Sequence, residues 1–150
     1  MIKWVVLCLT MFIVTPQAYA DESFVQVKSN HSVADTTARL EAVLLEKGMN
    51  VFARIDHAAG AAKADMELSP TELVIFGNPK VGTPRMKCGP TIARDLPQKA
   101  LMWEDQDGQV GLAYHRPEYL AERHQLEGGD EVLGKVSTAL AAFADAATRP

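Results

Sequence analysis

Cysteine is scarce in this sequence, and neither a cluster of basic residues nor a second long apolar run is present. The two cysteines are Cys8, which lies within the apolar N-terminal segment, and Cys88. The rest of the chain therefore cannot form an internal disulfide, and its stability must come from a hydrophobic core. The formal net charge is −4. We expect no nucleic-acid partner, because such binding needs a basic surface.

The one long apolar run, residues 4–14, is too short to span a bilayer comfortably. Lys3 precedes this run, and the small-residue sequence Ala-Tyr-Ala follows it at 18–20. This pattern predicts a secretory signal peptide over residues 1–20 that is cleaved at its end. We expect residues 21–150 to form a single domain that is periplasmic or secreted, with no membrane attachment after cleavage.

Two periodicities divide the rest of the chain into strands and helices. Apolar residues at three-to-four spacing predict a helix from Ser32 to Lys47, and a final helix after Asp130. The apolar stripe of the final helix comprises Val132 or Leu133, Val136, Leu140 and Phe143. Alternating apolar and polar residues, and short apolar runs beside turn signals, predict the strands. The expected strands are 24–28, 49–55, 71–76, 99–104 and 109–114, with an Asp-Gly hairpin turn at 107–108.

The order of these elements is strand, helix, four strands, helix. It predicts an α+β fold with two layers, in which a mostly antiparallel sheet of order β-α-β-β-β-β-α carries its helices on one face. The other face also needs cover if it is apolar. A second copy of the chain would supply that cover, so we expect a homodimer.

The stretch 76–88, FGNPKVGTPRMKC, lies between two strand-like runs and is the expected functional site. A long, chemically mixed loop between buried strands is where a scaffold commonly presents binding residues. Its glycines and prolines would fix a rigid loop whose backbone amides face a small-molecule ligand, or they mark sharp turns only. The predicted ligand-binding residues are His57, Phe76, Gly77, Asn78, Pro79, Thr83, Met86 and Cys88.

Met86 and Cys88 also support a redox or metal-linked alternative. A thioether and a thiol, with an imidazole from His57 or His124, suit Cu(I) or haem iron. The sequence has no Cys-x-x-Cys pair, no paired histidines at helical spacing and no haem-attachment motif. In the competing interpretation Met86 fills the core and Cys88 is an inert thiol. We therefore assign no metal ligand and leave the cofactor open.

His57 follows Asp56 at an expected strand-to-helix junction. The carboxylate would either orient the imidazole or cap the helix. An oriented His57 is the candidate base for a nucleophilic Cys88, whose thiolate the nearby Arg85 and Lys87 would stabilise. No Ser-His-Asp set or catalytic carboxylate pair stands out, so whether the protein is an enzyme stays open.

Short motifs in a fixed order run through nearly all of the expected domain. They are RIDHAA at 54–59, LVIFGNP at 73–79, GTP at 82–84 with Met86, DLP at 95–97, WED at 103–105 with Gly108, Tyr114, YLA at 119–121 and RH at 123–124. In these motifs the chain resembles the domain of unknown function 302 family. The resemblance implies a compact α+β fold of the order given above, often dimeric, and no established catalytic residue. Arg85 departs from it, because such proteins usually carry leucine there, and it places a charge at the mouth of the expected loop.

These observations predict an exported α+β homodimer that binds a small molecule or a partner at 76–88. The alternative is a periplasmic redox or metal- or haem-linked protein that uses Cys88, Met86 and His57.

Overall fold

A computed structural model describes residues 22–128 and 130–150 of the chain. The predicted signal peptide, residues 1–20, lies outside this part. Within the described ranges, no helix combines the length and the apolar character needed to cross a membrane.

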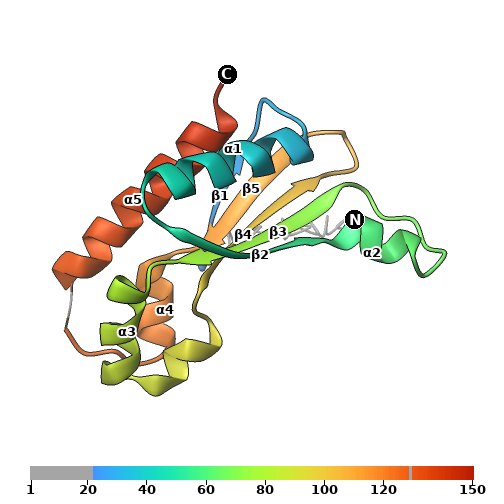
Figure 1. Cartoon of the computed structure of the whole chain (residues 1–150). Helices are drawn as coiled ribbons and strands as arrows, with labels where there is room; N and C mark the ends of the chain where they lie inside the picture. Colours follow the sequence, from blue (N-terminus) through green and yellow to red (C-terminus); the bar gives the residue numbers. More distant parts are fainter. Residues whose placement is uncertain (1–21, 129) are drawn as a thin grey trace, which may run out of the picture.

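The centre of the fold is a five-stranded sheet in which all neighbouring strands are antiparallel (Figure 1). The strand order is β1-β5-β4-β3-β2, so the first strand pairs with the last one. The strands are β1 (Phe24–Lys28), β2 (Asn50–Asp56), β3 (Thr71–Gly77), β4 (Gln98–Glu104) and β5 (Val110–His115).

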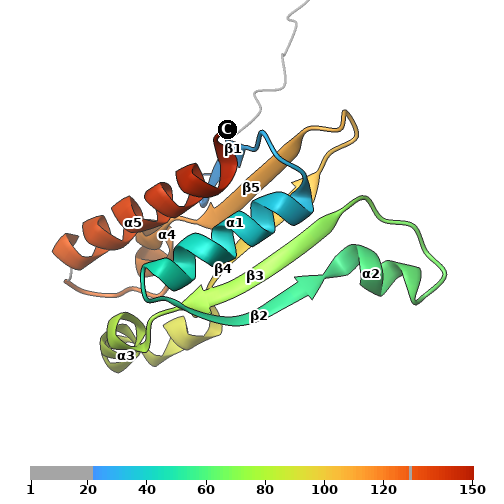
Figure 2. The same cartoon turned by 45° about the horizontal axis from the view of Figure 1, so that its top comes forward.

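Two long helices, α1 (Val33–Glu46) and α5 (Asp130–Thr148), pack together on one face of this sheet (Figure 2). Ser32 caps α1, because its side chain accepts a hydrogen bond from the backbone N–H of Asp35. The predicted two-layer α+β fold and its element order are confirmed. The short helices are α2 (His57–Ala62), α3 (Pro79–Cys88), the 3-10 helix η1 (Pro90–Arg94) and α4 (Pro117–Arg123).

The hydrophobic core lies between the sheet and these two long helices. Leu44, Phe76 and Met102 are at most 1% exposed there. Burial of one such side chain stabilises the fold by about 1.5–3 kcal/mol. The alternation along β3 and β4, with every second residue buried, directs these residues to the helix layer.

The opposite face of the sheet is left uncovered by the described helices. Leu73, Ile75, Leu101 and Trp103 point to it and are only partly buried. The indole of Trp103 lies across its cross-strand neighbour Gly111, where an added Cβ would come within 2.7 Å of the ring. This face is therefore apolar along its middle strands, as an interface between two copies of the chain would require.

The turn between β4 and β5 has the predicted hairpin form. Gly108 adopts a φ of +77°, which favours glycine. The carboxylate of Asp105 accepts hydrogen bonds of 2.9 Å from the backbone N–H groups of Asp107 and Gln109.

The stretch 76–88 is not the long loop that the sequence suggested. Most of it forms helix α3, which starts directly after β3. The side chain of Asn78 accepts a hydrogen bond from the backbone N–H of Lys80, and Pro79 occupies the first helical turn. Proline fits this position because the first N–H groups of a helix have no intrahelical acceptor. The turn signals of this stretch therefore mark a helix start.

Candidate functional site

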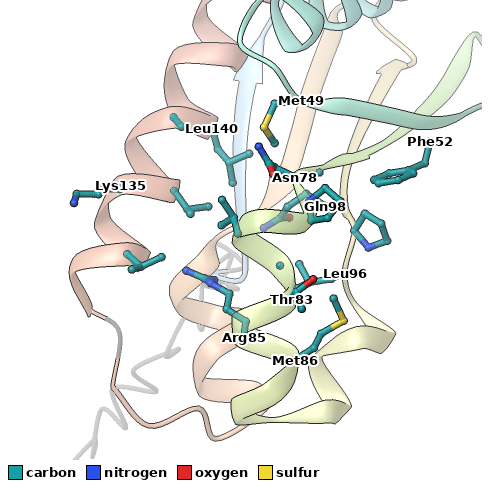
Figure 3. A pocket seen from close by; sticks show the side chains of 18 of the residues that line it. Met49, Phe52, Asn78, Thr83, Arg85, Met86, Leu96, Gln98, Lys135 and Leu140 are labelled. Atoms are coloured by element: carbon teal, nitrogen blue, oxygen red, sulfur yellow. The ribbon is translucent and has the colours of Figure 1, made fainter.

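A cavity of about 480 Å³ opens between α3, the N-terminal half of α5 and the adjoining ends of β3 and β4. Its lining is mostly apolar, and Figure 3 shows the side chains that surround it. The lining residues are Met49, Phe52, Gly77, Asn78, Pro79, Val81, Gly82, Thr83, Arg85, Met86, Leu96, Pro97, Gln98, Val132, Lys135, Val136, Ala139, Leu140 and Phe143.

Helix α5 supplies one wall through a single apolar stripe. Val132, Val136, Ala139, Leu140 and Phe143 follow the three-to-four spacing that places residues on one side of a helix. The stripe predicted from the sequence is therefore present. The C-terminal residues of this stripe, Leu140 and Phe143, belong to the hydrophobic core. Val132, near the start of the helix, is 45% exposed.

Two cationic side chains line the cavity, but they differ in their surroundings. The ammonium group of Lys135 pairs with Glu131 at 2.6 Å and lies on the outer side of α5 (Figure 3). The side chain of Arg85 projects from α3 towards α5. Within the described ranges, the Arg85 guanidinium has neither a hydrogen bond nor an ion pair. Burial lowers the pKa of Arg85, although the more distant charge of Glu118 opposes this effect.

Gln98 is a second polar residue of the lining without a partner. It begins β4 and is 8% exposed. Its side-chain amide makes no hydrogen bond to any residue in the described part of the chain. The buried side-chain atoms that lack a partner there are His115 Nδ1 and Arg116 Nε, so the amide atoms of Gln98 keep contact with solvent. Figure 3 shows Gln98 among the residues around the cavity. The cavity therefore contains a cation and an amide that are both free to bind a ligand.

The structure separates the eight predicted ligand-binding residues into three groups. Five of them line the cavity, namely Gly77, Asn78, Pro79, Thr83 and Met86. Phe76 is 1% exposed and belongs to the core. Cys88, at the end of α3, is exposed and does not line the cavity, nor does His57.

His57 lies at the opposite end of the sheet from α3 (Figures 1 and 2). The carboxylate of Asp56 accepts a hydrogen bond of 2.8 Å from the backbone N–H of Ala59, so Asp56 caps α2. At about 3.3 Å per strand residue, most of the length of β3 separates this point from α3. His57 therefore does not meet Met86 or Cys88.

A second polar cluster lies between η1 and the end of α4. The His124 Nε2 atom lies 2.6 Å from the carboxylate of Asp95, and its Nδ1 atom lies 3.0 Å from the hydroxyl of Thr91. Arg123 Nε lies 3.3 Å from the same Asp95 oxygen. A hydroxyl, an imidazole and a carboxylate in this order also occur in nucleophilic enzymes. None of these residues lines the cavity, so we interpret the cluster as a link between η1 and α4.

Asp95 remains ionised in this cluster because its neighbours are cationic or donate hydrogen bonds. Desolvation by burial would raise the pKa of Asp95, but the hydrogen bond from His124 and the nearby positive charges together lower it. These charges are that of the Arg123 guanidinium and, when the imidazoles are protonated, those of His124 and His115. The Asp95–His124 contact joins residues 29 positions apart, and nothing in the sequence pairs them.

The structure offers no preformed metal centre in its described ranges. No group of three or more His, Cys, Asp or Glu side chains there is placed to hold a metal ion. In addition, His57 lies apart from Met86 and Cys88, the other two residues of the redox or metal-linked alternative.

Solved and curated proteins resemble this chain in different ways. The crystal structure of an uncharacterized conserved DUF302 protein from Bacillus stearothermophilus superposes with a TM-score of 0.74, at 18% identity, over 83% of this chain and 97% of that one. This likeness supports the fold alone.

The curated relatives are longer proteins. A Brucella suis biovar 1 (strain 1330) protein named fluoride-specific ion channel FluC 1 is 52% identical over 115 residues, which cover 77% of this chain and 45% of that protein. A Brucella melitensis biotype 1 protein named fluoride-specific ion channel FluC 2 is also 52% identical over 115 residues, which cover 43% of that protein. The chain thus spans less than half the length of these relatives.

The family comparison covers most of the chain. Residues 25–143 match the family described as "Domain of unknown function DUF302". The match contains β1 from Val25 onwards, the other four strands, α1, α5 up to Phe143 and every residue that lines the cavity. The chain therefore belongs to the DUF302 family.

Proposed function

We propose that the protein is a binding module that takes a small, largely apolar ligand into the cavity between α3 and α5. The single observation that carries this proposal is the cavity itself. Its volume of about 480 Å³ lies in the range of about 300–1,000 Å³ that is typical of small-molecule sites. Protein interiors normally leave few voids larger than a water molecule. An apolar space of this size, with a few polar groups at its wall, fits a ligand better than a packing defect.

The names of the Brucella relatives make fluoride a further ligand to test. Fluoride is small and strongly hydrated, whereas the cavity is wide and mostly apolar. Desolvation of such an anion is costly unless hydrogen bonds replace its water. We therefore expect fluoride not to occupy the cavity.

A titration with the neutral fluorescent probe N-phenyl-1-naphthylamine tests this function. We expect saturable binding to the wild type and at least about tenfold weaker binding to Val136→Phe, because the larger ring fills the cavity. Thr138→Phe is the matched control, since Thr138 is exposed on the same helix and does not line the cavity. Absence of saturable binding, or equal binding to Val136→Phe in a folded protein, would contradict the proposal.

We also infer that two copies of the chain pair through the uncovered sheet face. Its half-buried apolar residues, among them Leu73 and Leu101, support this inference. Light scattering on the wild type should give a dimer at micromolar concentration. Leu101→Glu should give a monomer, and Gln26→Glu, at the exposed edge of the same face, should remain dimeric. A monomeric wild type would refute the dimer.

Export is proposed on the sequence of residues 1–20 alone. Fractionation of the host cells followed by N-terminal sequencing is expected to give a periplasmic or secreted protein that begins at Asp21. A cytoplasmic protein that retains Met1 would contradict export.

A further inference from the structure

We propose that the ligand carries a carboxylate at one end of an apolar body, and that Arg85 and Gln98 bind this carboxylate. The inference rests on the proposed function, since it specifies the chemistry of the ligand in the same cavity. Medium-chain alkanoates represent this class of ligand.

The state of Arg85 is the first argument. Guanidinium groups remain protonated in proteins, and several others in this chain either pair with a carboxylate or lie in water. Arg54 pairs with Glu72 at 2.7 Å, and Arg123 pairs with Asp95. Arg94, which also lacks a partner in the described part of the chain, is exposed to water. Arg85 differs from these three because it is partly buried in an apolar lining and the charge of Glu118 acts on it without forming an ion pair.

The state of Gln98 is the second argument. Gln98 is 8% exposed as a residue, but its unpaired amide is open to solvent, so a ligand that displaces this water must replace its hydrogen bonds. Its N–H donors suit a carboxylate oxygen, as do the paired donors of a guanidinium, which often bind carboxylates through two parallel hydrogen bonds. Two donors that line one cavity, from α3 and β4, therefore favour an anionic group over a cationic one.

The other residues of the lining are mostly apolar, and they determine that the rest of the ligand should be apolar too. Met86, Val136 and Leu140 offer no strong hydrogen-bond partner, so a sugar or other polar body would lose its bonds to water. At about 30 Å³ per water-sized group, 480 Å³ holds at most about 16 such groups. Decanoate fits within this limit.

Calorimetric titrations of the mature protein with decanoate, decanol, acetate and sodium fluoride test the inference. We expect decanoate to bind at least about tenfold more tightly than decanol, and acetate and fluoride not to bind measurably. Arg85→Leu should weaken decanoate by about tenfold while leaving decanol and the neutral naphthylamine probe unchanged. Arg94→Leu removes an exposed arginine outside the cavity and should change none of these affinities.

The outcomes separate the two proposals. The binding module stands if the neutral probe binds and Val136→Phe blocks this binding. The carboxylate assignment is nevertheless wrong if decanoate and decanol then bind equally and Arg85→Leu changes neither affinity. If neither the probe nor decanoate binds, the proposed function itself fails. Circular dichroism of Arg85→Leu checks that its fold is intact, and Gln98→Met provides a second variant that should also weaken decanoate selectively.

Discussion

Two groups of polar side chains lie at the α3 end of the molecule, and they differ in whether their partners are present. In the cluster of Asp95, His124, Thr91 and Arg123, each side chain has a partner within 3.3 Å. In the cavity, Arg85 and Gln98 have none in the described part of the chain. A satisfied cluster stabilises the fold. The guanidinium and the amide in the cavity make no such hydrogen bonds within the described part of the chain, so they contribute no comparable stability.

The largest stability effect is expected from breaking the satisfied cluster. Asp95→Ala removes the acceptor of His124 and Arg123, and we expect it to lower the free energy of unfolding by about 2 kcal/mol, as for hydrogen bonds to charged groups. Urea denaturation measures this change. The control is Glu122→Ala, because Glu122 is exposed beside the cluster and should change stability by less than about 0.5 kcal/mol. Equal effects of the two substitutions would refute a stabilising role for Asp95.

The same cluster should make stability depend on pH. The pKa of Asp95 is lower in the folded chain than its ordinary value, so the unfolded chain binds the proton more readily. Its contribution is therefore fully present above the ordinary carboxyl pKa of about 3.9, and it is lost as pH falls through the folded value. As the pH falls below about 4, Asp95→Asn should therefore lose less stability than the wild type. A steeper loss in the variant would contradict this assignment.

The smallest effect is expected at Arg85. Arg85→Leu breaks no hydrogen bond or ion pair within the described ranges and adds apolar surface to the cavity wall. We expect the free energy of unfolding to stay constant or to rise by up to about 1 kcal/mol. The same urea series measures this change. A decrease in the free energy of unfolding by more than about 1 kcal/mol would mean that Arg85 stabilises the fold, and would contradict the contrast between Arg85 and the Asp95 cluster.

The sequence predicted the sheet and its two long helices well, because their patterns are local. Alternation along 24–28 and 49–55, and the stripe of α5, depend only on side-chain direction. The stretch 76–88 was misinterpreted, because Asn78 and Pro79 serve turns and helix starts alike. Tertiary neighbours could not be predicted at all. Gln98 and Arg85 meet the same cavity only after α3, β4 and α5 have packed together.

The cavity adjoins the stretch 76–88 that the sequence analysis proposed as the site, but it does not bring together all of the residues that were grouped there. Met86 lines the cavity, as a binding role requires, but Cys88 faces solvent and His57 lies at the far end of the sheet. Their grouping rested on residue type, and residue type does not determine distance. The charge of Arg85, which the sequence analysis noted as a departure from the family pattern and as a possible partner of the Cys88 thiolate, lies in the cavity lining instead.

The most direct test of the binding cavity is a heteronuclear NMR titration of the ¹⁵N-labelled mature protein with decanoate. We predict saturable shifts of the backbone amide signals around the cavity, including Gly82, Thr83 and Val136, and unchanged signals for His57. Shifts concentrated instead at Leu73 and Leu101, on the uncovered sheet face, would contradict the account, because they would place the ligand outside the cavity.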